Sequence, residues 1–164
     1  MVLSTHSVIG ATTATILTRD PALGFLVGVA SHFLLDMVPH WDYTLASKRD
    51  PGTDDVQHKT MVFGRAFLFD CVKMGFDFGL GIAVVSVLAF SEPSVAWVLV
   101  AGLWGGVLPD ILQFCYFRAP RVFGWAQMIH ESVHSRFEIV RATDGIFAQA
   151  LLSLAAVMIW AGGI

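Results

Sequence analysis

The sequence predicts an all-α integral membrane protein, a bundle of about five transmembrane helices with one amphipathic helix at the membrane interface. Hydrophobic residues make up 55% of the 164 residues and charged residues only 14%, whereas a soluble domain has about 25% charged residues. The mean hydropathy is +0.68, and the apolar residues fall into several long runs rather than one. The length suits one transmembrane domain, residues 1–164.

Five apolar runs approach the length of a membrane span, which is about 20 residues with about 17 as the lower limit. They cover residues 2–18, 22–38, 62–90, 94–117 and 143–164. The first run lacks a preceding basic segment and a cleavage site, so we expect a retained helix rather than a signal peptide. Tight turns at 19–21 and 91–93 end in proline, which is tolerated at a helix start. These turns predict two helical hairpins.

Two longer connections determine the predicted orientation. Residues 41–61 are polar, and 118–142 contains an amphipathic stretch, 122–140, that predicts a helix lying at the interface. With five spans, these connections and the N-terminus share one side, which carries eight loop Lys and Arg residues against Arg19 on the other. Because cytoplasmic loops are enriched in Lys and Arg, we expect a multi-pass protein of the cell (inner) membrane with a cytoplasmic N-terminus.

Charge and cysteine usage exclude two other classes of protein. The net charge is −3 and the basic residues lie in separate loops, so we expect no nucleic-acid partner. Cys71 and Cys115 are isolated in or beside apolar runs. They predict neither a disulfide framework nor a cysteine zinc site.

The end of the second run carries the first candidate metal ligands. His32 and Asp36 are four residues apart and share a helix face, and His40 and Asp42 follow on a turn forced by Pro39. Imidazole and carboxylate at this spacing suit a divalent metal such as zinc. Ionisable residues inside a span are costly and indicate function. The structural alternative is a helix end with ordinary interfacial polar residues.

Residues 130–134 form a second candidate motif, His-Glu-Ser-Val-His, which satisfies HExxH. On a helix both imidazoles would face the same way, with Glu131 placed as a general base. The flanking sequence is Arg-rich and interfacial, so we favour His130 and His134 as a ligand pair over a protease signature.

A third candidate, Asp110, ends the glycine-rich segment 102–110, behind Pro109. We expect the glycines to let another helix approach closely and Asp110 to be functional. In the third run, Asp70, Lys73 and Asp77 lie along one stripe, which predicts an internal ion pair with Asp70 as a possible ligand. His58, in a polar loop, is expected to be solvated.

The predicted topology brings these residues to one membrane face. A zinc site takes three or four protein ligands, so neither His32 with Asp36 nor His130 with His134 fills one alone. We therefore predict that His32 and Asp36 meet at least one of His130 and His134 at one metal. The full predicted ligand set is His6, His32, Asp36, His40, Asp110, His130 and His134.

Two blocks of the sequence resemble known families. His-Phe-Leu-Leu-Asp at 32–36 and Leu-Pro-Asp at 108–110 resemble the blocks of the predicted membrane-bound metal-dependent hydrolases, small inner-membrane proteins with HxxLD and LLPDxD motifs. His32-x3-Asp36-x3-His40 is also similar, over about a dozen residues, to the ligand block of the zinc-dependent phospholipase C and nuclease family. The block order differs, and residues 111–113 lack the second Asp of the hydrolase motif. The resemblance implies metal ligation by His32, Asp36 and Asp110.

The function expected from these features is hydrolysis with a divalent metal, zinc by its ligands, of a phosphoester or other ester. The substrate would be a membrane lipid or lipid-linked molecule at the cytoplasmic face, with Glu131, Asp110 and Asp42 as candidate catalytic groups. Two alternatives remain open: an intramembrane zinc metalloprotease built on residues 130–134, and a non-catalytic metal-binding or transport membrane protein.

Overall fold

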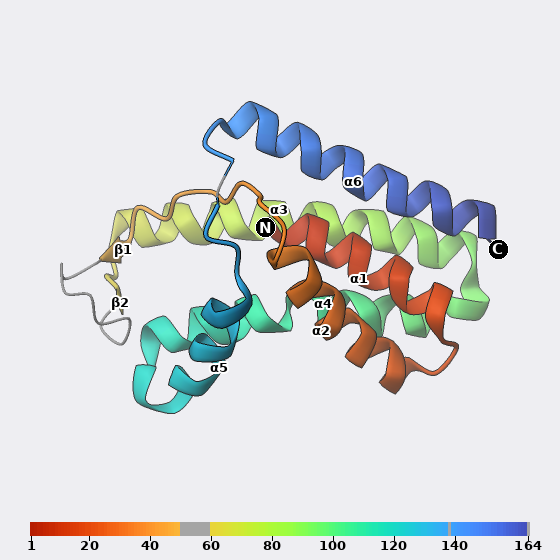
Figure 1. Cartoon of the computed structure of the whole chain (residues 1–164), viewed down its shortest axis with the longest axis horizontal. Helices are drawn as coiled ribbons and strands as arrows, with labels where there is room; N and C mark the ends of the chain where they lie inside the picture. The colour runs from red at the N-terminus through yellow and green to blue at the C-terminus, as the bar shows by residue number, and fades with distance from the viewer. Residues whose placement is uncertain (50–59, 138, 164) are drawn as a thin grey trace.

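The computed structural model describes residues 1–49, 60–137 and 139–163, and it is helical throughout apart from one short strand pair (Figure 1). The helices are α1 (Leu3–Leu17), α2 (Pro21–Asp36), α3 (Arg65–Ser91), α4 (Ala96–Arg118), α5 (Pro120–Val133) and α6 (Ala142–Gly163). A 3-10 turn, η2 (Pro93–Val95), precedes α4, and β1 (Lys48–Arg49) pairs antiparallel with β2 (Thr60–Met61). The predicted all-α class is confirmed for the described residues.

Three helical segments are long and apolar enough to cross a membrane: Arg65–Ser91, Pro93–Arg118 and Ala142–Gly163. Helices α1 and α2 have 15 and 16 residues. At about 1.5 Å per residue they reach about 22 and 24 Å, less than the about 30 Å of a hydrocarbon core. The described structure therefore supports a membrane bundle, whereas the five spans predicted from the apolar runs are not confirmed.

Helix α1 is the centre of the bundle rather than one of its outer spans. It packs against α2, α3, α4 and α6, and most of its residues are buried. The core around it joins residues of several helices, namely Val8, Ala11, Val85, Leu88, Val95, Leu99, Leu103 and Trp160. A hydropathy pattern gives the apolar character of such a helix but not whether protein or lipid surrounds it.

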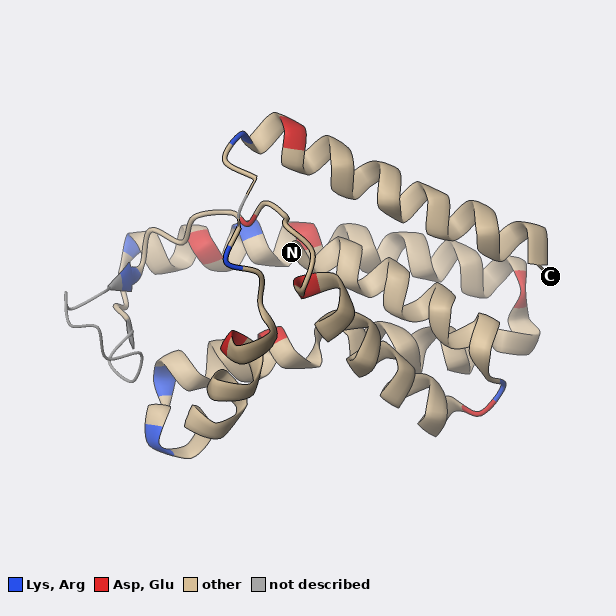
Figure 2. Ribbon diagram, in the orientation of Figure 1, with Lys and Arg blue, Asp and Glu red and all other residues tan. Residues whose placement is uncertain are grey.

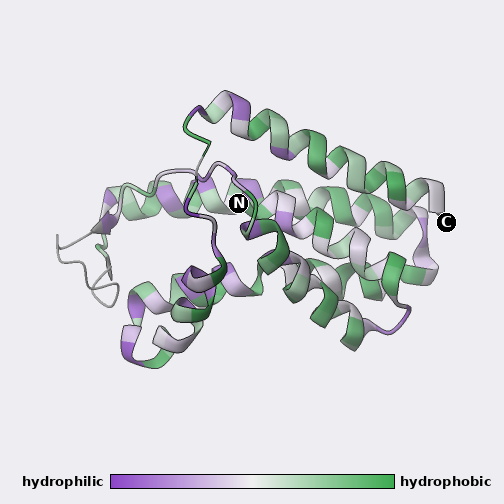
Figure 3. Cartoon of the chain, viewed as in Figure 1, coloured by the Kyte–Doolittle hydropathy of each residue, from purple (hydrophilic) through white to green (hydrophobic). Residues whose placement is uncertain are grey.

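Helices α3 and α6 carry many exposed apolar residues, and their ribbons are largely green, the colour of hydrophobic residues (Figure 3). Exposed large hydrophobic residues on these helices include Phe69, Phe76, Val87, Phe90, Phe147, Leu154 and Met158. A soluble monomer rarely exposes large contiguous apolar patches, so this many exposed apolar side chains is consistent with a membrane protein.

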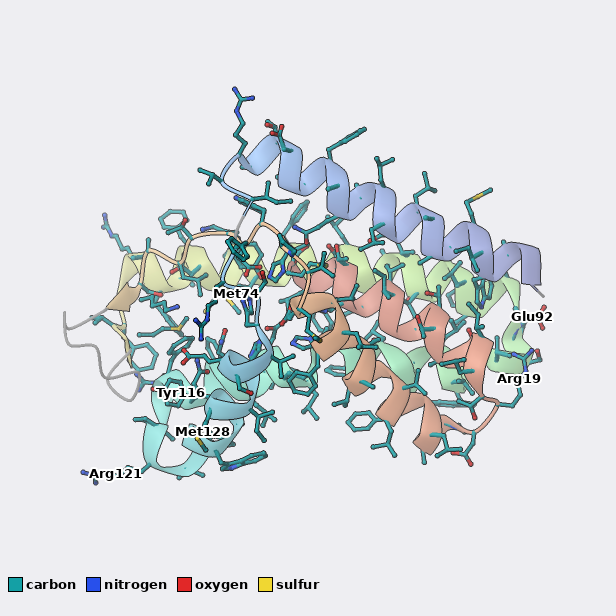
Figure 4. All side chains as sticks on the ribbon, viewed as in Figure 1. Arg19, Met74, Glu92, Tyr116, Arg121 and Met128 are labelled. Atoms are coloured by element: carbon teal, nitrogen blue, oxygen red, sulfur yellow. The ribbon has the colours of Figure 1, made fainter. Side chains whose placement is uncertain are left out.

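Charged residues collect toward one end of the molecule, where α5 and the strand pair lie (Figure 2). Arg19 and Glu92 mark the other end, far from Tyr116, Arg121 and Met128 (Figure 4). The bundle therefore has two chemically different ends, and the candidate ligands described below belong to the more highly charged one.

Glycines bring α4 into close contact with its neighbours. A Cβ atom at Gly106 would meet the carbonyl oxygen of His6 in α1, and one at Gly105 would meet the carbonyl oxygen of Phe25 in α2. Because backbone oxygens cannot move aside as a flexible side chain can, these positions require glycine. The predicted packing role of the glycine-rich segment is confirmed here.

A Gly106→Ala variant is expected to lower the free energy of unfolding by about 1–3 kcal/mol, the usual effect of overpacking, because its methyl group pushes α1 away from α4. The measurement is unfolding in detergent, followed by circular dichroism. Gly79→Ala in α3 is the matched control, since no described atom would lie within 4 Å of its Cβ. Equal stability of the two variants would contradict the tight contact.

Candidate metal centre

Histidine and aspartate side chains from four parts of the fold converge at the charged end of the bundle. They come from α1, from the C-terminal end of α2 and the residues after it, from α4, and from the end of α5. Their ligand atoms form four overlapping groups of three, each within 4.8 Å. The members are His6, His32, Asp36, His40, Asp42, Asp110, His130 and His134.

Asp36 lies at the middle of this cluster and is fully buried. Its Oδ2 atom is 3.1 Å from Nε2 of His32 and 2.9 Å from Nε2 of His130. Its Oδ1 atom is 3.2 Å from Nε2 of His6 and 3.7 Å from Nε2 of His40. Four imidazole nitrogens thus surround one carboxylate, and the two oxygens face different histidines.

Three other residues of the cluster, His40, Asp42 and His134, contact one another beside Asp36. Nε2 of His40 lies 3.2 Å from Oδ2 of Asp42 and 3.2 Å from Nε2 of His134. Nε2 of His134 is 3.5 Å from the same oxygen of Asp42. The backbone nitrogen of Met1 also approaches both carboxylates, at 2.8 Å from Oδ1 of Asp42 and 3.2 Å from Oδ1 of Asp36.

Backbone carbonyls fix the orientation of three of these imidazoles. Because a carbonyl oxygen only accepts, the Nδ1 atom next to it carries a proton and donates. The donor and acceptor pairs are His32 with Gly106 (2.7 Å), His40 with Val38 (2.7 Å) and His134 with Ser135 (3.0 Å). A neutral ring then has its lone pair on Nε2, which faces the carboxylates. Metal-binding histidines are held in this same way.

With Nε2 protonated, these contacts are hydrogen bonds to Asp36 and Asp42; with the rings neutral, lone pairs and carboxylate oxygens would face one another, a donor set that fits a divalent cation. The lone pairs of His40 and His134 would meet at 3.2 Å. Two other buried atoms, Nδ1 of His6 and Oδ2 of Asp110, have no hydrogen bond among the described residues, although buried polar atoms are normally bonded. The buried His and Asp groups could therefore hold a metal ion, and nitrogen with oxygen donors suits zinc and its neighbours.

Asp42 and His134 are the members of the cluster that lie in irregular segments nearest to solvent. Burial raises the pKa of Asp42, but hydrogen bonds from His134 and His40 outweigh it and hold this pKa well below its usual range. The hydrogen bond to Asp42 raises the pKa of His134. The carboxylate is thus ionised at neutral pH, and a cation binding here would displace a proton from His134.

The structure differs from the prediction at the HExxH motif. Helix α5 spans Pro120–Val133 rather than 122–140, and His134 has an extended backbone with φ −60° and ψ 133°. The chain beyond it runs beside the segment after α2, where the N–H of Ser135 donates to the carbonyl of Asp36 (2.6 Å). His130 and His134 therefore do not share one helix face, as a zincin-type motif requires.

Glu131 lies apart from the metal-binding groups that the described residues form. Its Oε1 atom accepts a hydrogen bond from the side chain of Gln127, one turn earlier in α5 (2.8 Å). By contrast, Asp110 joins His32 and His130 in one group, and Asp42 joins another. Of the three expected catalytic groups, the structure places two in the cluster.

Sequence reasoning missed Gln113, whose side-chain amide is 3.4 Å from Nδ1 of His130. An amide oriented with its oxygen toward the ring would accept the Nδ1–H and leave Nε2 for a metal. Gly106, Asp110 and Gln113 are spaced by four and three residues, so they share one face of α4. This spacing is the sequence feature from which Gln113 could have been predicted to lie near the cluster.

The polar stripe of α3 supports the cluster without joining it in the described structure. The predicted ion pair is present, with Nζ of Lys73 3.5 Å from Oδ1 of Asp70. Asp70 also accepts hydrogen bonds from Ser47 N–H (2.8 Å) and Oγ–H (2.7 Å), and Asp77 accepts one from Oγ–H of Ser4 (2.6 Å). These bonds hold the loop after Asp42 and the start of α1. His58 lies outside the described residues.

A cavity of about 450 Å³ opens beside the cluster. Its polar wall contains Asp42, Asp110, His130 and His134. Its lining also includes Tyr43, Met74, Phe114 and Phe117 together with Lys48, whose Nζ lies 5.2 Å from the centre of the Phe117 ring. The cavity thus joins candidate metal ligands to an aromatic surface with a positive charge.

Known proteins offer no template for this centre. No family model matches the chain, and no curated protein or solved structure matches it. The function is inferred below from the donors, their geometry and the cavity.

Proposed function

We propose that this protein is a membrane-embedded metal-dependent hydrolase that cleaves a phosphoester or other ester of a lipid or lipid-linked substrate. The observation that carries the proposal is the orientation of His32, His40 and His134. Each donates Nδ1–H to a carbonyl and turns Nε2 toward buried carboxylates. Metal-binding histidines are held by such an Nδ1–H bond, and loss of the proton from Nε2 would free these nitrogens for a cation.

A bound divalent cation, zinc by the donor set, would lower the pKa of a coordinated water toward about 7 and polarise the scissile group. The residues of the chain then have separate tasks. His32, Asp36 and His130 would hold the cation on the bundle side. Asp110, with its unbonded Oδ2 beside the cavity, would accept the proton of the attacking water.

The cavity supports a lipid headgroup as the reacting part of the substrate. It is lined by residues from the beginning of α1, the segment after α2 and the C-terminal part of α4, where a headgroup could meet the ends of apolar helices. Lys48 offers a positive charge for a phosphate, and the aromatic rings offer an apolar wall for the adjoining glycerol or prenyl carbons. This combination favours an anionic headgroup.

The test is hydrolysis in mixed micelles of detergent and an anionic phospholipid, measured as release of the headgroup. We expect activity that a chelator removes and zinc restores, and that His32→Ala lacks. Zinc-loaded protein without activity toward phospholipid, lipid-linked phosphate and ester substrates would favour the non-catalytic alternative. Cleavage of a membrane peptide, abolished in Glu131→Gln, would favour the protease.

We also propose a cytoplasmic location for the end of the bundle that carries the cluster, in the inner membrane and with five spans. In a variant lacking Cys71 and Cys115, a cysteine at Arg121 is expected to react with an impermeant thiol reagent only after cell lysis. A cysteine at Glu92, in the opposite end, should react in intact cells with a permeabilised outer layer. The reverse labelling pattern would overturn the orientation.

A further inference from the structure

We infer that the cluster holds two cations rather than one, with the carboxylate of Asp36 bridging them. This inference rests on the proposed metal site and adds the number of ions and the substrate class. It follows from three observations: two complete ligand sets that share no residue, the different directions of the two Asp36 oxygens, and the residues that line the cavity.

The first set consists of His32, Asp36 and His130, with Asp110 beside them. The three distances between Nε2 of His32, Nε2 of His130 and Oδ2 of Asp36 are 3.5, 2.9 and 3.1 Å. Ligands of one tetrahedral zinc, with bonds of about 2.0–2.2 Å, lie about 3.4 Å apart. Asp110 belongs to a group with His32 and His130. His32, Asp36 and His130 would thus supply three ligands of one tetrahedral site and leave the fourth position, near Asp110, for water.

The second set consists of His40, Asp42 and His134. The corresponding distances between Nε2 of His40, Nε2 of His134 and Oδ2 of Asp42 are 3.2, 3.2 and 3.5 Å. These are again the edges expected around one zinc. The set shares no residue with the group of His32, Asp110 and His130, although His134 also lies in a group with Asp36 and His130, so the two sets adjoin each other. A single ion in the first set would therefore leave the Nε2 atoms of His40 and His134 facing each other.

Asp36 connects the two sets. Its Oδ2 atom faces His32 and His130, and its Oδ1 atom lies 3.7 Å from Nε2 of His40. A carboxylate that binds one ion through each oxygen suits the separation of about 3.5–4 Å found in two-metal sites. His6 lies on the Oδ1 side as well, 3.2 Å away, with its ring stacked on that of His32.

The cavity meets both sets, which identifies the substrate class. Asp110 and His130 of the first set line it, and so do Asp42 and His134 of the second. Two-metal sites stabilise the attacking and the leaving oxygen of an in-line displacement at phosphorus. The reaction assigned to this centre is therefore phosphoester hydrolysis, in which water adds to phosphorus, the P–O bond to the lipid alcohol breaks, and that alcohol takes a proton.

The experiment counts metal ions per chain in the purified, zinc-loaded protein by mass spectrometry, together with electron paramagnetic resonance after Mn²⁺ loading. We expect two zinc ions and an exchange-coupled Mn²⁺ pair, because the bridge holds the ions about 3.5–4 Å apart. His134→Gln should retain one ion and give an uncoupled Mn²⁺ spectrum. Asp77→Asn, outside both sets, should keep two.

The outcomes separate this inference from the proposed function. One zinc ion per chain with an uncoupled spectrum in the unmodified protein overturns the pair and leaves a metal-dependent hydrolase standing. Two ions that both survive in His134→Gln overturn the assignment of the second set. No bound metal overturns the proposed function as well. The Mn²⁺ spectrum of the unmodified protein needs no variant, so a folding defect in a variant cannot decide the result.

Discussion

An Asp36→Asn variant is expected to lose metal binding and hydrolysis together. The amide is nearly the same size but neutral, so four Nε2 atoms lose the charge that now lies among them, those of His6, His32, His40 and His130. Loss of an outer partner of a metal site lowers affinity or activity by about 10- to 100-fold. Loss of the central ligand should exceed about 100-fold, measured by zinc titration calorimetry and by headgroup release.

Asp77→Asn is the matched control for this variant. It removes a carboxylate that bonds to Ser4 in the same bundle but lies outside the ligand groups found among the described residues. We expect lower stability and unchanged zinc affinity. The backbone carbonyl of Asp36, which accepts from Ser135, stays in place in Asp36→Asn, so circular dichroism should show a native helix content. Native zinc affinity in Asp36→Asn would remove Asp36 from the centre.

Asp110→Asn is expected to lower kcat by about 100-fold or more, the range that general acid–base groups contribute. The reason is that Oδ2 of Asp110 is buried without a hydrogen bond in the described structure, beside the cavity and next to His32 and His130. The measurement is steady-state hydrolysis by the zinc-loaded variant, with zinc content determined on the same sample. A loss of kcat at full zinc content would assign Asp110 to proton transfer, and a loss of zinc would assign it to ligation.

Glu131→Gln provides the comparison, because it makes the same chemical change in the residue that an HExxH mechanism would need. Its side chain contacts Gln127 along α5, so we expect kcat to change by no more than about 3-fold, far below the effect of a general base. Inactive Glu131→Gln with active Asp110→Asn would reverse the assignment of the base.

The position of the candidate metal ligands could be predicted from the sequence, because local spacing and helix direction decide it. His32 and Asp36 are one helical turn apart, and the structure places Nε2 of His32 3.1 Å from Oδ2 of Asp36. Asp110 and His6 follow from the alternating direction of the helices, which brings the end of α4 and the start of α1 to the end of α2. The alternating helix direction alone is enough to predict that these residues lie close together.

The residue at which α5 ends and the burial of α1 inside the bundle could not be predicted from the sequence, because long-range contacts decide both. The amphipathic pattern continues past Val133, but N–H groups of Ser135 and Ile139 bond to the carbonyls of Asp36 and His40. Those bonds replace the helical ones that the pattern predicted. Similarly, α1 is as apolar as a span, yet its neighbours bury it.

The polar stripe of α3 shows a third limit. Asp70 could have been a ligand by residue type, and the sequence gives no sign that Ser47 would donate two hydrogen bonds to it. A carboxylate that accepts several hydrogen bonds from a loop stabilises that loop, and its oxygens are then already bonded. Partners from irregular segments have no periodicity, so their pairing is visible only in three dimensions.

The candidate ligands are spread from His6 in α1 to His134 after α5. The cluster is therefore complete only after the polypeptide has been made through Ser135, whose N–H bonds to the carbonyl of Asp36. On the proposed function, a chain truncated before α5 would lack His130 and His134, and it would neither hold the cation nor hydrolyse a substrate.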